Sequence, residues 1–477
     1  MWEIVAGSTR AKIRQRRGDG QYPRFEIHPP PDGSLYWPIV ATPVTSTPIA
    51  ARIEPSLSGE SVSIPGLTPW DCLARVRAEA AGRPVLFWES PTGEAVAGIG
   101  AACRLEASGP GRFAELRERL ERIFARAEHR GASPQGFPGP IAVGGFSFAE
   151  QGPRRGWPGF ADGCFLVPAR TFWHAPGAET VETRWRAAPD RETEAEPVES
   201  ASAEAEPAEP WDRAAWIRAV RLTLDKIREG EISKAVLARS REIALGPSAD
   251  PVPILASLRD AYPSCYRFLI DDGRGNAFLG ASPERLVRLS GGEVSTEAVA
   301  GTQRCGPGDD AEELARALVA RAKDRSEQRV VVRHLLEALG PVCGTLEAPE
   351  TPEVMRLPHL LHLRTRVGGP ARQGANVLDL ISRLHPTPAV AGWPQSQALE
   401  WIRRAESGCR GWYSGAVGWV NSAGEGDFAV GIRAVGIRAG RAGVFAGAGI
   451  VEGSDPELEW NETELKMKGI LDAIARD

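Results

Sequence analysis

The chain of 477 residues contains little cysteine and no long apolar run. Its seven cysteines are odd in number, scattered and without a C-x-x-C pair. This argues against a disulfide framework or a zinc site and favours the reducing cytoplasm. Because no run of about 20 apolar residues occurs, we expect no membrane span. The opening residues, "MWEIVAGSTRAKIRQRRGDG", lack the apolar core of a secretory signal.

Strong charge bias and the common catalytic motifs are also missing. A net charge of −5 with a pI near 6.0 leaves no basic footprint for nucleic acid. We find no phosphate-binding loop, dinucleotide fingerprint, metal–histidine motif or nucleophile elbow. Lysine is rare, with six among the 57 basic residues, so a lysine in an apolar setting stands out.

The remaining composition is that of a globular protein, at 42% hydrophobic and 25% charged residues. Residues 1–55 are rich in proline, arginine and polar residues and predict a poorly ordered extension. Residues 56–186 alternate short apolar runs with turn residues, which predicts the first strands of the domain. Residues 187–210 are acidic and rich in alanine and proline, which predicts a linker or long loop. Residues 211–477 form the last region.

That last region mixes groups of strands and helices. "DAEELARALVARAKDRSEQRVVVRHLLEALG" predicts a long helix or a pair of helices, and "FAVGIRAVGIRAG" predicts strand. Such mixing is typical of the α+β class. We therefore predict a large, mainly antiparallel sheet with helices packed outside it.

The segment "GSDPELEWNETELKMKGIL" predicts a helix that turns charge toward its own core. Ser454 or Asp455 suits the N-cap, and Pro456 suits the first helical position. At about 100° per residue, two apolar flanks form, and the acids and lysine between them face inward. The apolar flanks contain Trp460, Met467 and Leu471 on one side and Leu458 and Leu465 on the other; between them lie Glu459, Glu462, Lys466 and Ile470.

Two interpretations of this helix stay open. Buried charge needs a partner, so Glu462 and Lys466 could form an ordinary salt bridge between residues i and i+4. Alternatively, the acids could hold a cation. The preceding "VFAGAGIVEGS" predicts a strand and a glycine bend, where Gly447 and Gly449 would let backbone N–H groups approach an anionic ligand.

Three further stretches place charge in apolar surroundings. Lys234 begins the strand "KAVLARS" and could act as a base in a dry pocket, or extend its amine to water. Glu284 follows a Ser-Pro turn and could keep its proton as an acid, or lie on the surface. Asp324 and Glu327, at i and i+3, could share a cation with the C-terminal helix, or form an exposed salt-bridged face.

Tyr413 and Arg433 fall in two predicted neighbouring strands, "RGWYSGAVGWV" and "FAVGIRAV". A phenol and a guanidinium can together bind a carboxylate. The alternative is a core tyrosine and an edge arginine.

Taken together, these stretches resemble the chorismate-utilising enzymes. The similar segments are "SKAVLAR", "GASPERLV", "TEAVAGTQR", "KDRSEQRVVV", "LLHLRTRV", "HPTPAVAGWP", "RGWYSGAVGWV", "FAVGIRAV" and "AGAGIVEGSDPELEWNETELKMKGIL". They run in family order over about residues 211–474, and "VLFWES" and "GIGAA" extend the resemblance more weakly. "HPTPAVAGWP" and "FWES" favour the isochorismate synthase branch.

The resemblance implies a fold, a substrate and roles for these residues. It implies the fold of that family, chorismate as substrate, Mg²⁺ as cofactor, and isomerisation to isochorismate. Lys234 would be the base and Glu284 the acid. The remaining implied roles are metal binding by Glu327 and Glu462, with Glu459 and Asp324 in support, and substrate binding by Gly301, Thr302, His362, Tyr413, Arg433, Gly447, Gly449 and Lys466.

The resemblance also implies partners and alternatives. We expect a monomer or weak dimer without a glutaminase subunit. The product would feed menaquinone, with siderophore or salicylate synthesis as alternatives. The alternative activities are those of a salicylate synthase and of an aminating relative. Gln328, where many relatives carry histidine, and Asn461 depart from the family pattern.

Overall fold

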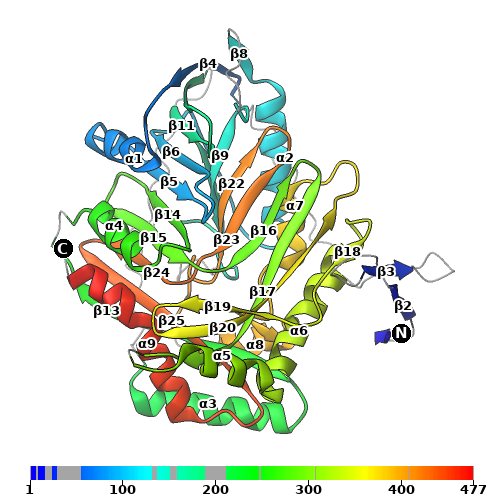
Figure 1. The fold of residues 1–477 in the computed structure, drawn as a ribbon. Coiled ribbons are helices and arrows are strands. Elements are labelled where there is room, and N and C mark those ends of the chain that lie inside the picture. Colours follow the sequence, from blue (N-terminus) through cyan, green and yellow to red (C-terminus); the bar gives the residue numbers. More distant parts are fainter. Residues whose placement is uncertain are drawn as a thin grey trace.

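Two large sheets lie face to face in the computed structural model, with helices on their outer sides (Figure 1). The structure describes residues 2–6, 9–16, 24–28, 55–130, 137–150, 157, 159–187, 211–246, 249–306, 308–406 and 408–475. Strands pair antiparallel, as β13 does with β25 and β17 with β20, whereas β4 and β8 run parallel.

The first sheet contains 13 of the described strands. Its order is β1 (Trp2–Ala6), β2 (Thr9–Arg16), β3 (Arg24–His28), β18 (Leu346–Glu347), β20 (Leu360–Pro370), β17 (Glu293–Arg304), β16 (Arg285–Ser290), β23 (Gly426–Val430), β22 (Ala416–Asn421), β9 (Ile141–Phe146), β10 (Gly163–Val167) and β7 (Cys103–Ala107), and β19 (Glu353–Leu357) also pairs with β20.

The second sheet contains 12 of the described strands. Its order is β21 (Gly392–Trp393), β13 (Lys234–Ala244), β25 (Arg441–Val451), β24 (Ala434–Arg438), β15 (Asn276–Ser282), β14 (Tyr266–Asp271), β5 (Val85–Glu89), β6 (Ala95–Ile99), β11 (Arg170–His174), β12 (Thr180–Ala187), β4 (Leu57–Ile64) and β8 (Glu128–Arg130).

Helices cover the outer faces of both sheets. One group, α2, α6 and α7, packs on the first sheet, and α1, α4 and α9 pack on the second, with α3 against β13 and β25. The helices are α1 (Pro69–Ala78), α2 (Arg112–Ala125), α3 (Arg213–Arg228), α4 (Pro251–Ala261), α5 (Ala311–Ala320), α6 (Ala322–Leu339), α7 (Val377–Leu384), α8 (Gln395–Ala405) and α9 (Pro456–Ala475).

Both faces of several strands are buried, as in β5, β9 and β22, which explains why these strands are continuous apolar runs. In β5, Val85 and Phe87 face the helices, whereas Leu86 and Trp88 face the other sheet. Successive side chains of a strand point to opposite faces, so each such strand contributes to two hydrophobic layers.

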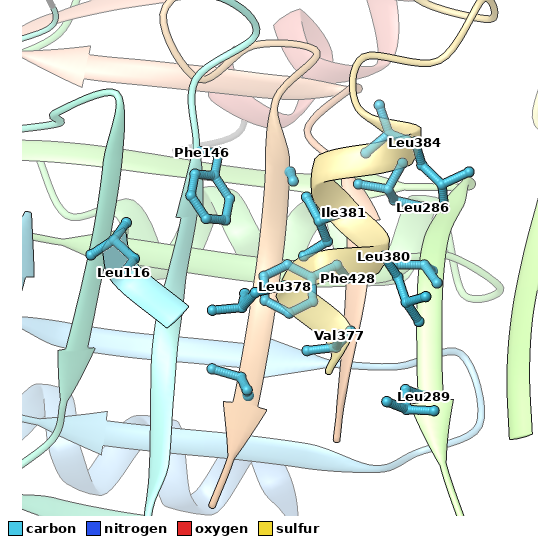
Figure 2. Packing of buried hydrophobic residues seen from close by; sticks show 14 of the residues in the cluster. Leu116, Phe146, Leu286, Leu289, Val377, Leu378, Leu380, Ile381, Leu384 and Phe428 are labelled. Carbon is cyan, nitrogen blue, oxygen red and sulfur yellow. The ribbon is translucent and has the colours of Figure 1, made fainter. Parts of the chain in front are cut away.

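Helix α7 illustrates how one helical face completes the outer layer. Its apolar residues, Ile381 among them, meet Phe428 of β23 and Leu286 of β16 (Figure 2). All three side chains are almost completely buried.

The chain passes between the sheets twice at one place. Glu284 lies between β15 of the second sheet and β16 of the first, and residues 431–433 lie between β23 of the first and β24 of the second. Hydrogen bonds join the two crossings: Val430 N–H donates to Glu284 O at 3.0 Å, and Ala281 N–H donates to Arg433 O at 3.1 Å.

The predicted α+β class, antiparallel strands and outer helices are confirmed. "FAVGIRAVGIRAG" is divided between strands of different sheets, and the long helical segment is two helices separated at Arg321, whose ψ of 121° is not helical. Strands β1–β3 fall within the predicted N-terminal extension, whereas residues 29–54 and nearly all of the predicted linker lie outside the described residues. None of the helices in the described ranges is long and apolar enough to cross a membrane.

We predict that Ile381→Ala lowers the free energy of unfolding by about 2–5 kcal/mol, because it leaves a cavity between α7 and the first sheet. Leu222→Ala is the control, since that side chain is 54% exposed, and it should change stability by less than about 0.5 kcal/mol. Urea unfolding measures both. Equal losses in the two variants would contradict the packing of α7.

Candidate active site

Buried Lys234 and partly buried Glu327 form an ion pair between a strand and a helix. Lys234 is the first residue of β13, and its Nζ lies 2.7 Å from Glu327 Oε1 on α6. Gly449 of β25 lies beside the pair: a Cβ there would be 3.1 Å from both Lys234 Cε and Glu327 Oε1. Glycine therefore leaves the space that this pair occupies.

Glu284 is held at the sheet crossing with its side chain buried. Among the described residues, its hydrogen bonds are made by the backbone, with Ser282 and Val430, and its carboxyl has no such partner. Burial, and then the charge of Glu297, raise the pKa of Glu284 to about 8, against the opposing charges of Lys234 and Lys466. The carboxyl is therefore mainly protonated at pH 7.

A bulge in β17 brings Gly301 and Thr302 to His362 of β20. The strand register shifts between Ala300 and Thr302, and Gly301 has a φ of +70°, which suits glycine. His362 Nδ1 donates to Gly301 O at 3.0 Å and lies 3.3 Å from Thr302 Oγ1. Burial, then the charges of Arg433 and Lys466, lower the pKa of His362 to about 3. The imidazole is thus neutral and leaves Nε2 as an acceptor.

Asp324 lies directly behind this bulge. A Cβ on Gly301 would be 3.0 Å from its Oδ1, and the backbone N–H of Thr302 hydrogen-bonds its carboxyl. Arg321 Nη1 is 3.4 Å from Oδ2, yet Oδ2 is buried without a hydrogen bond among the described residues. Burial raises the pKa of this carboxyl above its usual value. One oxygen is therefore available for a further positive partner.

Helix α9 carries the second lysine–acid pair. Asp455 caps it by accepting from two backbone N–H groups. Lys466 Nζ is 2.6 Å from Glu462 Oε1 and donates to Gly447 O at 2.9 Å. Burial and the nearby charge of Glu462 raise the pKa of Glu459 to about 7.

The inward charge predicted for α9 is confirmed, with one error on its flank. Glu459 is buried, and Glu462 and Lys466 are partly buried. Leu458 was assigned to an apolar flank, but it is 69% exposed. The angular position of a residue around a helix axis does not show how much of that side other elements cover.

Tyr413 and Arg433 lie beside the strands rather than in them as predicted. Tyr413 precedes β22 and Arg433 precedes β24, and both are buried. The two segments are joined by Ser414 N–H, which donates to Gly431 O at 2.8 Å. The Tyr413 ring stacks on Phe445 at 5.1 Å, and its hydroxyl would be 3.5 Å from a Cβ on Gly447.

Contacts and charge effects thus join all the predicted site residues in one region. In the described part of the chain, no group of three His, Cys, Asp or Glu residues could hold a metal ion by itself. A bound Mg²⁺ would need water and substrate oxygens as well, which is common for Mg²⁺. The unsatisfied oxygen of Asp324 and the crowded charges of Glu459 and Glu462 fit such a cation.

Sequence reasoning missed two groups that act on this region. Glu297 raises the pKa of Glu284. The only sequence feature that could have pointed to Glu297 is its position as a charged residue within a strand, β17. Glu406 and Arg410 contact the backbone of β13, but their spacing is that of an ordinary exposed helical pair.

The chain belongs to the chorismate-binding enzymes, because the sequence model of the family described as "Chorismate binding enzyme" matches residues 47–475. It is similar to the salicylate biosynthesis isochorismate synthase of Pseudomonas aeruginosa, with 35% identity over 82% of this chain and 85% of that protein. It is also similar to isochorismate synthase MenF of Bacillus subtilis, with 33% identity over 81% and 87% of the two chains.

Solved structures agree on the fold. The structure of MenF, the menaquinone-specific isochorismate synthase from Escherichia coli, matches with a TM-score of 0.72 and 25% identity, over 88% of this chain and 95% of that chain. Anthranilate synthase component I from Streptococcus pneumoniae matches with a TM-score of 0.60 over 92% and 98% of the chains; at 21% identity it supports the fold alone.

We predict that Glu284 is protonated at pH 7 and ionises near pH 8. Infrared difference spectra between the wild type and Glu284→Gln should show a protonated-carboxyl band at about pH 6 that disappears by about pH 10. The exposed Glu293→Gln is the control and should give no such band. An ionised carboxylate in the Glu284 difference spectrum at about pH 6 would contradict the assignment.

Proposed function

We propose that this protein is an isochorismate synthase, which isomerises chorismate to isochorismate. One observation carries the proposal: the buried carboxyl of Glu284, whose pKa burial raises to about 8, is close enough to the buried Lys234 for the lysine charge to act on that pKa. An acid and a base with separated protonation are what the reaction requires.

The proposed reaction adds water at one carbon of the ring and removes a hydroxyl at another. After its ammonium separates from Glu327 and releases a proton to solvent, the neutral Lys234 amine takes a proton from water as the water oxygen bonds to C2. The ring double bonds shift, and the bond from C4 to its hydroxyl oxygen breaks. Glu284 gives its proton to that oxygen, which leaves as water. The substrate therefore gains and loses one water, so the net change is an isomerisation.

The predicted metal ligands would hold Mg²⁺ near this reaction. Glu327 and Glu462 would bind it, with Asp324 and Glu459 in direct or water-mediated support. A bound Mg²⁺ would neutralise the ring carboxylate of chorismate. Supporting this, each of the four acids is buried or partly buried, and two have a raised pKa.

The remaining predicted residues would bind the rest of the substrate. Tyr413 and Arg433, with the Gly447 and Gly449 backbone, would bind the enolpyruvyl carboxylate. Lys466, Gly301 and Thr302 would surround the ring carboxylate. His362 is neutral, and its Nε2 can accept a hydrogen bond from a ring hydroxyl.

We further propose a cytoplasmic enzyme that works as a monomer or weak dimer without a glutaminase subunit. Menaquinone synthesis is the proposed destination of the product. Relatives named for menaquinone and for salicylate synthesis are similar to this chain to comparable degrees, so the salicylate route is the second candidate.

We predict that Lys234→Ala and Glu284→Gln each lower kcat by about 10²–10⁴-fold, the range for loss of a general base or acid. Chorismate consumption and isochorismate formation, measured by liquid chromatography with Mg²⁺ present, give the rates. Lys468→Ala and Glu400→Gln, both exposed on helices, are the matched controls and should keep wild-type rates.

Circular dichroism should show that all four variants are folded. Near-full activity in either site variant would refute the roles of these residues. If the wild type produces salicylate fluorescence without an added lyase, the activity is that of a salicylate synthase and not of an isochorismate synthase.

We predict that Glu462→Ala raises the Mg²⁺ concentration for half-maximal activity by at least about tenfold, because a ligand is lost. Glu457→Ala on the same helix is the control, since Glu457 pairs with Arg213 on the surface. Binding of Mn²⁺, followed by electron paramagnetic resonance, provides a second measurement. An unchanged Mg²⁺ dependence would show that Glu462 of α9 is not a metal ligand.

A further inference from the structure

A buried ion pair, Glu406–Arg410, lies outside the proposed chemistry. Glu406 and Arg410 follow α8 at i and i+4, and both side chains are almost completely buried. Arg410 Nε lies 2.9 Å from Glu406 Oε2, and Arg410 Nη2 lies 2.5 Å from Glu406 Oε1. Burying such a pair costs desolvation and is weak evidence for a stabilising role. Its hydrogen bonds to the backbone give it a different role.

These bonds are made along one edge of β13. One edge of β13 pairs with β25 over its whole length, but the other pairs with β21 only at Lys234 and Ala235. Directly beyond that point, Arg410 Nη2 donates to Val236 O at 2.6 Å, and Ala238 N–H donates to Glu406 Oε1 at 2.9 Å. The Glu406 carboxylate thus supplies the acceptor, and the Arg410 guanidinium the donor, that a neighbouring strand would otherwise supply.

Arg410 also contacts two other segments. Its Nη1 donates to Val390 O at 2.9 Å, and its guanidinium lies 4.1 Å from the centre of the Phe148 ring. Its own carbonyl accepts from Tyr413 N–H at 3.0 Å. One guanidinium thus links the strand that begins at Lys234 with the turn that holds Tyr413.

We propose that Glu406 and Arg410 are positioning residues, which hold the β13 edge and the Tyr413 turn in one fixed arrangement. Lys234 is then placed for its proton transfer while Tyr413 is placed for the substrate carboxylate. This inference rests on the proposed isochorismate synthase activity for the roles of those two residues. The fixed arrangement itself rests only on the contacts of the pair.

Arg410→Lys tests this, because lysine keeps the charge but cannot bond Glu406, Val236 and Val390 in the same fork geometry. We expect kcat to fall by about 10²-fold, the effect of displacing a catalytic group by about 1 Å, and KM for chorismate to rise. Glu406→Gln keeps an oxygen for Ala238 N–H, so we expect a smaller loss, about tenfold. It serves as the second variant if Arg410→Lys does not fold.

The same helix offers a matched control. Glu400 and Arg404 form a Glu–Arg pair at the same spacing on the exposed face of α8. Glu400→Gln and Arg404→Lys should leave kcat and KM at wild-type values. Hydrogen exchange followed by mass spectrometry should be faster in peptides covering 234–240 and 408–414 for Arg410→Lys, and unchanged for Arg404→Lys.

The outcomes separate this inference from the proposed function. If wild-type protein converts chorismate and folded Arg410→Lys keeps kcat and KM within about twofold, the positioning role is refuted. If exchange in both peptides is unchanged, the fixed arrangement is refuted whatever the activity. If wild-type protein does not convert chorismate at all, the proposed function fails, while the exchange measurement still decides whether the pair holds the two segments.

Discussion

The double passage of the chain between its two sheets determines the position of the proposed acid. A residue at such a crossing has neighbours from both sheets, so Glu284 is buried although it lies in no strand. The crossing at 431–433 bonds to it through backbone groups, and Arg433 takes a positive φ of 50° there. A left-handed residue other than glycine is uncommon and persists when its surroundings hold it. Each crossing therefore supports the conformation of the other.

Local surroundings separate acids that the sequence alone cannot distinguish. Glu327 and Glu462 each form an ion pair with a lysine, Lys234 and Lys466 respectively. Burial first, and then the charge of Glu297, raise the pKa of Glu284 and favour its neutral form, and its carboxyl has no hydrogen-bond partner among the described residues. The same side chain thus forms an ion pair with lysine at two positions and is the proposed proton donor at a third.

Sequence periodicity could predict what depends on neighbours along the chain. The N-cap of α9, its inward charge and the i,i+4 pair of Glu462 and Lys466 are of this kind. Periodicity could not show that "FAVGIRAVGIRAG" changes sheets at Gly431, because both halves have the same apolar pattern. Nor could it show that the Glu406–Arg410 pair is buried, since burial depends on β13, which is distant in sequence.

Gln328, which stands where the family resemblance predicts histidine, illustrates how adjacent residues of α6 have different roles. The Gln328 side chain bonds to the first sheet: its Nε2 donates at 2.9 Å to Ala298 O of β17 and at 2.9 Å to Thr365 Oγ1 of β20. These bonds fasten α6 to the two strands that carry Gly301 and His362. An exchange of side chain at this position therefore acts on the support of the helix, while Glu327, one residue earlier, keeps its bond to Lys234. Variation behind the site is compatible with an unchanged set of charged groups inside it.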